Sequence, residues 1–318
     1  MKSALKVAAR LSTAAVLTTA LTACGSDDGG AAGGADDGFT IGFVNADNLD
    51  FHQCLRAGVD AEAEKRGVEI VEANSIRDPG KEQSNVEDMI VRQVDAIVLQ
   101  TVNIDSLEGA IANANAADIP IFLTSVGGPD LDSVAGAELS DVRQTGERSA
   151  AWLAEDAAGQ DVKVGIIAGA PGAASDLFIA GFKSKLPTTA SVVFEQPGMF
   201  QRAKAQEVTE NMLQSNSDVD YVFVPNEEMA FGALTAFENA ERSDIKIIAN
   251  GGTEKGLEAT ADGRFAMLVA SSPYDLGAKA IATVTDLLEN PEDEPVIGEV
   301  PLTVVTKENV ADAPPYCG

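Results

Sequence analysis

The sequence predicts an α/β protein with two doubly wound parallel-sheet lobes. A chain of 318 residues exceeds what one compact core usually contains, so its length favours two domains. From Phe39 onward, short apolar runs alternate with amphipathic segments of helix length, and the alternation continues through two series. Alternating strands and helices form parallel sheets through right-handed crossovers. Two series of this kind therefore predict two sheets, each covered by helices.

The first series contains four predicted strands separated by three predicted helices. We expect the strands at residues 39–44, 68–73, 96–100 and 119–124, and the helices at 51–66, 80–92 and 106–117. The second series adds strands at 162–168, 192–195, 219–224, 245–249 and 265–270, with helices near 141–157, 175–186, 202–215, 229–239 and 253–261. A last helix over 275–289 and a proline-containing turn lead to a final strand near 302–305. The strands are short and mostly apolar, as buried parallel strands are.

Residues 1–23 have the pattern of a secretory signal peptide, with a basic start, an apolar middle and small residues at the end. The apolar part is too short to remain as a membrane-spanning anchor. The run Leu-Thr-Ala-Cys24-Gly resembles the lipobox of bacterial lipoproteins, which implies a diacylglycerol on Cys24; plain secretion is the alternative. Residues 24–38, mostly Gly, Ala and Asp, would form a flexible tether. We therefore expect an extracytoplasmic lipoprotein anchored to the cell membrane, at the cell surface or in the periplasm.

The composition narrows the function classes. The chain has 22 basic and 50 acidic residues and a formal net charge of −28, which repels nucleic acid and anionic lipid. It contains one histidine, His52, and lacks a Gly-x-Ser-x-Gly sequence, clustered Cys and His, and a phosphate-binding loop. These features argue against acyl transfer, a zinc site and NTP hydrolysis, although the many carboxylates leave an acid/base pair open. We therefore expect no catalytic residues, no cofactor and no metal site.

Asn226 is the strongest candidate for a binding residue. It follows the apolar run 221–224 and Pro225, which places it at the carboxyl end of a strand, where α/β sheets bind ligands. Two acidic residues come next, and this order also suits a residue that only caps a helix. The run Asn226-Glu-Glu-Met-Ala-Phe-Gly-Ala resembles the Asn-Asp-x-x-Ala-x-Gly-Ala segment of the ribose/galactose-type periplasmic binding proteins. The resemblance covers nearly all of residues 39–307 and includes fragments at 84–92, 119–121, 195–197, 251–253 and 276–279.

The resemblance implies an architecture and a function. In this family the chain crosses between two lobes three times, and the matching positions lie near 139–140, 271–272 and 300–304. The implied parts are a first lobe of 39–139 plus 272–300, a second lobe of 140–271 plus 301–310, and a tail over 311–318. Such lobes close on a ligand by hinge motion. The resemblance implies a monomeric binding protein that captures a small sugar or polyol and delivers it to an ABC permease.

Two other functions are compatible with related folds. A sensory receptor of the same fold, for a nucleoside, a furanose or an amine-bearing small molecule, is the alternative that the sequence leaves open. A transcriptional regulator would need a helix-turn-helix ahead of the first lobe, but a signal peptide occupies that place and the net charge has the wrong sign.

The resemblance also implies ligand-binding positions, which are Asn45, Phe51, His52, Phe200, Asn226 and Ser271. Phe51 and Phe200 match aromatic residues that pack on the sugar from opposite lobes, and the polar residues would bind its hydroxyl groups. His52 stands where the family often has a second aromatic residue, and its ring would titrate near neutrality; a surface position is the alternative.

The chain departs from the family at its charged contacts. Ser125 and Val126 replace an Asp-Arg pair, and Gly251 replaces an Asp; by their matching positions, Ser125 and Gly251 are also candidate ligand-binding residues. An expected Arg is missing from the segment that contains Asp176, although Asp176 itself is a candidate ligand contact. The ligand could therefore be a small polyol, a deoxy sugar, a furanose or an amine-bearing solute.

Two cysteines remain besides Cys24, and an exported chain favours a disulfide between them. We expect the proline-rich tail to run back across the hinge region and to be joined to the first helix through Cys54 and Cys317. Two free thiols are the alternative.

Overall fold

The computed structural model describes residues 38–127 and 131–318, and residues 38–318 form one compact unit. The predicted signal peptide, Cys24 and all but the last residue of the predicted tether lie outside the described residues. Among the helices that are described, none has the length and apolar character needed to cross a membrane.

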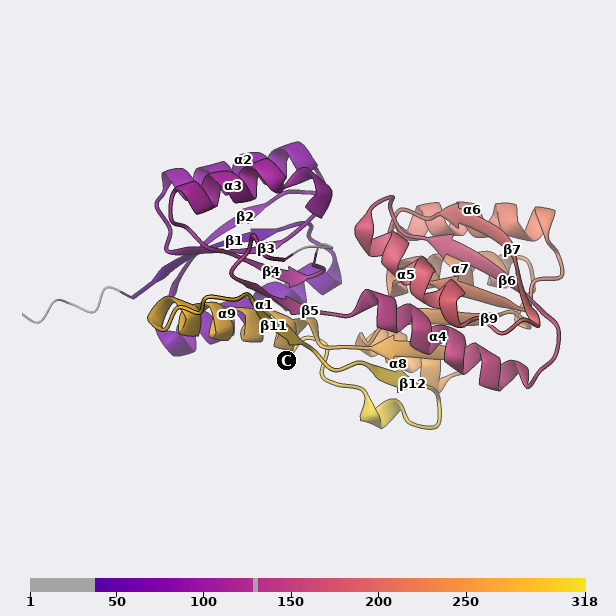
Figure 1. Cartoon of the computed structure of the whole chain (residues 1–318). Coiled ribbons are helices and arrows are strands. Elements are labelled where there is room, and N and C mark those ends of the chain that lie inside the picture. The colour runs from indigo at the N-terminus through magenta and orange to yellow at the C-terminus, as the bar shows by residue number, and fades with distance from the viewer. Residues whose placement is uncertain (1–37, 128–130) are drawn as a thin grey trace, which may run out of the picture. The chain divides into compact units, whose positions relative to one another are not determined.

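The first sheet has six parallel strands in the order β11-β5-β4-β3-β1-β2. Its strands are β1 (Thr40–Asn45), β2 (Glu69–Asn74), β3 (Ala96–Gln100), β4 (Ile121–Ser125), β5 (Gly136–Leu139) and β11 (Val296–Glu299). One face is covered by α1 (Asp50–Arg66) and α9 (Pro273–Glu289), and the other by α2 (Pro79–Val91) and α3 (Glu108–Ala116) (Figure 1). Phe43 and Phe122 fill the first face, whereas Val44 and Leu99 fill the second.

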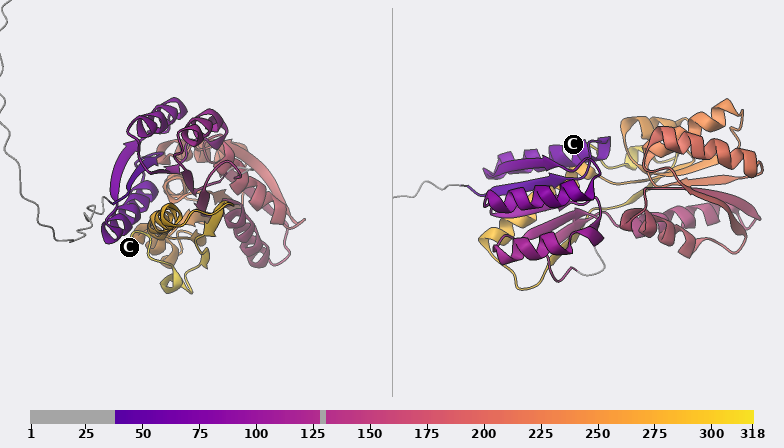
Figure 2. Two further views of the ribbon diagram at one scale, coloured as in Figure 1. Left: turned by 60° about the vertical axis from the view of Figure 1, so that its left-hand side comes forward. Right: turned by 90° about the horizontal axis from the view of Figure 1, so that it is seen from above.

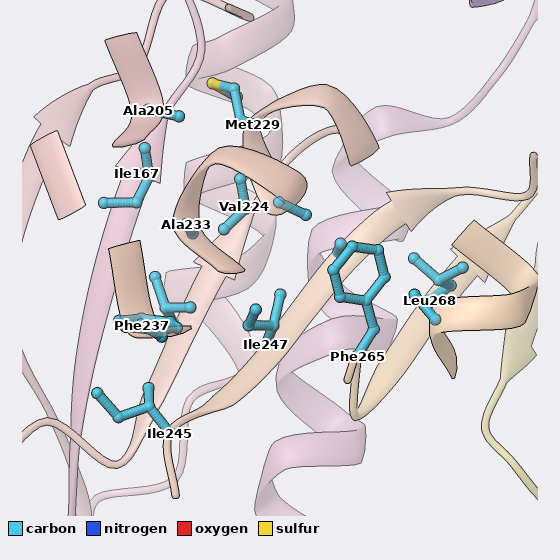
Figure 3. Close-up of a cluster of buried hydrophobic side chains, with 14 of the residues drawn as sticks. Ile167, Ala205, Val224, Met229, Ala233, Phe237, Ile245, Ile247, Phe265 and Leu268 are labelled. Carbon is cyan, nitrogen blue, oxygen red and sulfur yellow. The ribbon is translucent and has the colours of Figure 1, made fainter. Parts of the chain in front are cut away.

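The second sheet also has six strands, in the order β12-β10-β9-β8-β6-β7. Its strands are β6 (Val162–Ala168), β7 (Ala190–Pro197), β8 (Tyr221–Val224), β9 (Lys246–Gly251), β10 (Met267–Ala270) and β12 (Thr303–Val305). Its helices are α4 (Val142–Ala157), α5 (Ala173–Lys185), α6 (Arg202–Ser215), α7 (Glu227–Asn239) and α8 (Glu254–Ala261). Figure 3 shows the cluster that packs α6, α7 and α8 on this sheet, with Val224, Phe237 and Phe265 in it. A second cluster, which includes Leu153 and Phe182, packs α4 and α5 on the opposite face.

The predicted fold class is confirmed, with two differences in detail. The sequence pattern did not indicate β5 and β11, which lie together at one edge of the first sheet. Each has only four residues and includes a glutamate, so neither forms an apolar run. The last strand, β12, pairs antiparallel with β10 and is the exception to the parallel pattern. Two short 3-10 turns, η1 (Ile104–Ser106) and η2 (Val310–Asp312), complete the described elements.

The chain passes between the two sheets three times, from β5 into α4, from β10 into α9, and from β11 into β12. The second passage is ordered by a helix cap, because the Ser272 hydroxyl accepts a hydrogen bond from the Asp275 N–H at 3.1 Å. Pro273 occupies the first turn of α9, where its missing N–H has no cost. The passages lie between residues 139 and 142, 270 and 273, and 299 and 303.

Two glycines allow α1 and α9 to pack closely. A Cβ on Gly58 would lie 2.0 Å from the Tyr274 carbonyl oxygen, and a Cβ on Gly277 would lie 2.1 Å from the Leu55 carbonyl oxygen. Neither position can accept a side chain without separating the helices. The contact therefore fixes the start of α9 beside α1, which carries three of the residues considered below.

Candidate ligand-binding site

Most of the predicted binding residues lie at the carboxyl ends of parallel strands. Asn45, Ser125 and Gly251 are the last residues of β1, β4 and β9, and Ser271 directly follows β10. Asn226 lies between β8 and α7. Because the strands of a parallel sheet end at the same edge, the fold gathers these residues into two groups, one on each sheet.

On the first sheet, Asn45 orders the turn that carries both aromatic candidates. Asn45 is buried, and its Nδ2 donates to the His52 carbonyl oxygen at 3.1 Å. Phe51 and His52 occupy the first turn of α1, with their ring centres 5.3 Å apart and their planes at 79°. Among the described residues, the buried Oδ1 of Asn45 and Nδ1 of His52 have no hydrogen-bond partner. The structure therefore brings these three predicted residues together.

Burial keeps the imidazole of His52 neutral. Removal from water lowers the pKa of His52 to about 4, because the charged form is penalised. The carboxylate of Asp47 opposes this shift, the charge of Arg77 adds to it, and a hydrogen bond with Gln100 opposes it. The prediction that this ring titrates near neutrality is therefore wrong, because no local pattern reveals that the Nδ1 atom of this half-buried residue is shielded from water.

Arg77 and Gln100 belong to this group although the sequence analysis did not select them. Arg77 Nε lies 2.9 Å from Asp47 Oδ2, and Gln100 Oε1 accepts a hydrogen bond from the Ala46 N–H at 3.1 Å. Gln100 ends β3, and Arg77 follows β2 by three residues. Their positions after strands are the signal that would have found them. The Arg77 guanidinium balances the charge of Asp47, so this half of the site has no unpaired carboxylate among these residues.

Ser125 supports the backbone of the passage between the sheets. It is buried, its φ is 78°, and its carbonyl oxygen accepts a hydrogen bond from the Ser140 N–H at 2.9 Å. A positive φ is uncommon for a residue other than glycine and frequently occurs at functional sites. The side chain is short and uncharged, so it cannot replace a carboxylate that grips a sugar.

On the second sheet, Asn226 has the geometry of both a helix cap and a binding residue. Its Oδ1 accepts a hydrogen bond from the Met229 N–H at 2.9 Å, which caps α7. This bond uses only the oxygen of the amide. Among the described residues, no partner occupies the Nδ2 donor, which remains available to a ligand hydroxyl.

Gly251 makes room for the buried carboxylate of Glu227. A Cβ on Gly251 would lie 2.3 Å from the carboxyl carbon of Glu227. That carboxylate accepts hydrogen bonds from the Gly252 N–H at 2.5 Å, the Thr253 N–H at 3.2 Å and the Thr253 hydroxyl at 2.5 Å. Burial raises the pKa of Glu227, and these hydrogen bonds oppose the shift. From the sequence, Glu227 is expected only as a first-turn residue, yet its carboxylate fixes the loop beside Asn226 and Gly251.

Phe200 lies between β7 and α6, and its ring packs partly on the core. A Cβ on Gly169, which follows β6, would lie 2.1 Å from the Cζ of Phe200. The ring is only partly buried and contacts the cluster beneath α6 and α7. One side of Phe200 is therefore fixed by packing, which suits a rigid apolar wall.

Ser271 and Asp176 have different surroundings. Ser271 is buried, and its N–H donates to the Gly251 carbonyl oxygen at 3.3 Å, so the two predicted residues are adjacent. Asp176 is exposed in the first turn of α5, and no described contact joins it to the other candidates. The structure does not bring Asp176 into either group.

Cys54 of α1 and Cys317 form a disulfide with a Cα–Cα distance of 4.6 Å. The bond joins positions separated by 263 residues in sequence. It ties the tail to the helix that carries Phe51 and His52, as the sequence analysis expected.

The two groups offer amides, hydroxyls, aromatic rings and a neutral imidazole. This chemistry suits hydroxyl groups and C–H faces of a small polar molecule. Within the described ranges, no three His, Cys, Asp or Glu side chains are arranged to hold a metal ion.

The chain is similar to known proteins over most of its length. Residues 41–292 match the family described as periplasmic binding protein domain. The ribose import binding protein of Bacillus subtilis (strain 168) is 32% identical over 272 residues, which are 85% of this chain and 88% of that protein.

Two solved structures are similar throughout. The periplasmic binding protein component of the arabinose ABC transporter from Shewanella sp. ANA-3, bound to α- and β-L-arabinofuranose, has a TM-score of 0.80 and 27% identity, covering 86% of this chain and 93% of that chain. The ABC transporter solute binding protein from Bacillus halodurans C-125, with bound myo-inositol, has a TM-score of 0.79 and 26% identity, covering 88% of this chain and 98% of that chain.

Proposed function

This chain belongs to the periplasmic binding protein family, in its type I group of sugar-binding proteins that serve ABC importers, and we propose that it captures a small uncharged furanose or polyol between its lobes. Members of this group bind substrates for transporters and are not enzymes. The observation that carries the proposal is that each sheet has a group of polar and aromatic residues at the carboxyl ends of its strands. One contains Phe51 and the neutral His52, and the other contains Phe200 and Asn226.

The uncharged residues at the positions of the family's charged contacts support a neutral ligand. Ser125 and Gly251 supply no charge, and Arg77 pairs with Asp47 rather than remaining free. The carboxylate of Glu227 is occupied by three hydrogen bonds from Gly252 and Thr253, in the loop after β9. Hydroxyl groups can be bound by the Nδ2 of Asn226, while the faces of the two phenylalanine rings cover C–H groups.

The similar proteins bind compounds of the same chemical class. These compounds are ribose, L-arabinofuranose and myo-inositol, all uncharged and rich in hydroxyl groups. A furanose or polyol fits a site that lacks the charged contacts described for the ribose/galactose type.

The proposal extends to the cellular context. Cys24 would be lipidated after removal of residues 1–23, and residues 24–38 would tether a monomer to the outer side of the membrane. The lobes would comprise 39–139 plus 272–300 and 140–271 plus 301–310, with the passages between the sheets as the hinge. The closed form would deliver its solute to an ABC permease.

A substitution at Asn226 tests the binding site without removing the helix cap. Asn226→Asp keeps the Oδ acceptor for the Met229 N–H but replaces the Nδ2 donor by a carboxylate oxygen. Leaderless protein is screened by thermal shift and calorimetry against L-arabinose, ribose, myo-inositol and xylitol, with putrescine as the amine control. A specific ligand at a hundredfold excess over its Kd stabilises by about 2.7 kcal/mol. We expect the variant to keep its ligand-free stability and to lose at least tenfold in affinity. Binding of putrescine alone, or unchanged affinity in the variant, would contradict the proposal.

A further inference from the structure

The segment after β12 contacts the second sheet and its helices before it reaches the disulfide. We call residues 313–318 the tail strap. Val310 and Ala313 pack against the apolar cluster beneath α8. The ring of Tyr316 then lies over Gly252, because a Cβ on Gly252 would be 3.3 Å from Tyr316 Cδ2. Gly252 has a φ of 133°, so the turn presents bare backbone to the ring.

The following residues of the strap are attached to the helices of the first sheet. Cys317 is bonded to Cys54 in α1, and the Tyr316 carbonyl oxygen accepts a hydrogen bond from the Tyr274 N–H of α9 at 3.4 Å. Gly318 lies against the Tyr274 ring. Figures 1 and 2 show the C-terminal end beside the first-sheet helices, as the disulfide requires. Two consecutive residues of the strap, Tyr316 and Cys317, therefore contact the second sheet's loop and the first sheet's helix α1.

Between α1 and α8, the strap takes the place of direct packing of one helix on the other. It forms one wall of a cavity of about 780 Å³, which is also lined by Asp50 and Gln53 of α1 and by Leu257 and Glu258 of α8. Helices α1 and α8 have no extensive contact of their own. The connection between them passes through Tyr316 and Cys317.

The strap ends next to both groups of the binding site. Cys54 follows His52 by two residues in α1. Gly252 follows Gly251, and its N–H donates to Glu227, which is adjacent to Asn226. A displacement of the strap would therefore move the backbone that positions the two groups.

We propose that the tail strap limits how far the lobes open and thereby raises ligand affinity, an inference that rests on the proposed binding function. The disulfide alone cannot impose this limit. From Val305, where β12 ends, to Cys317 there are twelve residue steps, which extend to about 40 Å. The packing of Val310 and Ala313 takes up part of this slack. The seat of Tyr316 on Gly252 takes up the remainder, because Tyr316 directly precedes Cys317 and one residue step spans at most about 3.6 Å. The Cys54–Cys317 bond and the packing of Tyr316 on Gly252 therefore act together to limit opening.

The observed affinity depends on the fraction of the protein whose lobes are arranged to bind ligand. A strapped protein samples fewer open arrangements, so a larger fraction is ready to bind. If release of the strap lowers that fraction tenfold, the observed Kd rises about tenfold.

The test compares two ways of releasing the strap. Cys54→Ser/Cys317→Ser removes the covalent bond, and Tyr316→Ala removes the seat while the disulfide remains. Asp312→Ala, in exposed η2, is the matched control. Single-molecule FRET between unnatural amino acids at the exposed positions Asn113 of α3 and Glu210 of α6 reports the interlobe distance. A dithiol reagent provides a third release: it gives two electrons and two protons to the Cys54–Cys317 bond, yielding two thiols, and is itself oxidised to a disulfide.

We expect each release to lengthen and broaden the ligand-free distance distribution and to raise Kd about tenfold. Saturating ligand should restore the wild-type bound distance. Combining Tyr316→Ala with the cysteine variant should add little, since both act on one device. Unchanged ligand-free distances in Tyr316→Ala and in the reduced protein would overturn the proposal, even if the double serine variant failed to fold. The ligand-free distances decide on the strap even when no solute of the panel binds, a result that would count against the proposed ligand class alone.

Discussion

Gly251→Ala should destabilise the protein through a clash with one identified group. The new Cβ would lie 2.3 Å from both the carboxyl carbon and the Cγ of Glu227, far inside contact distance. Glu227 cannot simply rotate away, because the residue is only 6% exposed and its carboxylate accepts hydrogen bonds from the Gly252 N–H and from Thr253. Overpacking of this kind costs about 1–3 kcal/mol. The melting temperature of ligand-free protein should therefore fall by roughly 2–4 °C for each kcal/mol lost.

Two further variants separate this clash from the general effect of adding a methyl group. Gly109→Ala lies in α3, where a Cβ meets nothing within 4 Å, so it should stabilise by up to about 1 kcal/mol through helix propensity. Glu227→Ala leaves the Gly252 N–H and the Thr253 groups without their acceptor, at a cost of roughly 1–3 kcal/mol. In the double variant the new methyl group enters the space that Glu227 vacated. The cost of the pair should therefore be smaller than the sum of the single costs by more than about 0.5 kcal/mol.

Urea unfolding and thermal melting of the leaderless, ligand-free protein measure all four variants. The reasoning is refuted if Gly251→Ala is as stable as Gly109→Ala, or if the effects of Gly251→Ala and Glu227→Ala are additive. Either result would mean that Glu227 does not occupy the space beside Gly251.

Three other predictions concern protonation, capping and the disulfide. The pKa of His52 is lowered from 6.5 to about 4 in the folded protein, so on acidification the unfolded chain binds a proton at this ring before the folded protein does. The unfolding free energy should therefore fall by up to about 3 kcal/mol as the pH drops from about 6.5 to 4. This loss should be absent from the His52→Gln protein in urea titrations, and an identical pH profile for both proteins would contradict the assignment. Ser272→Ala should cost about 1 kcal/mol by removing the cap of α9, whereas Ser272→Asp should retain most of the stability in thermal melts; equal losses would exclude the cap as the cause. Removal of the disulfide, which closes a loop with a sequence separation of 263, should lower the unfolding free energy by up to about 5 kcal/mol. No difference between oxidised and reduced protein in urea would show that the bond does not constrain the unfolded chain.

Much of the fold follows from local patterns in the sequence. Buried runs such as 96–100 and 162–168 have the apolar character of parallel strands, and the helix expected at 202–215 has those bounds. The strands that escaped prediction, β5 and β11, are held by pairing at a sheet edge rather than by an apolar pattern of their own. Short edge strands depend on a neighbour that is distant in sequence, so a local pattern does not reveal them.

The positions of the candidate residues could be predicted where a strand end coincides with a family motif. Asn45, Gly251 and Ser271 lie at or directly after strand ends, and Asn226 proved to be a helix cap, whereas ligand binding by these residues stays a prediction. The shielding of the His52 Nδ1 atom from water could not be predicted, because it depends on several separate segments around one ring. Glu227 was missed for a similar reason.

The burial of Glu227 depends on two glycines that are distant from it in sequence. A Cβ on Gly251 or on Gly256 would lie 2.3 Å or 2.0 Å from Glu227 side-chain atoms. The space for a buried carboxylate is thus a property of three segments together, and no single motif records it.

A crystal structure of the leaderless protein with the tightest-binding solute from the panel would test the central claim most directly. We predict one solute molecule between the two sheets, with a hydroxyl oxygen within hydrogen-bond distance of Asn226 Nδ2 and the faces of Phe51 and Phe200 against its C–H groups. A solute found instead in the cavity beside Tyr316, or one held by an ion pair with an acidic side chain, would contradict it.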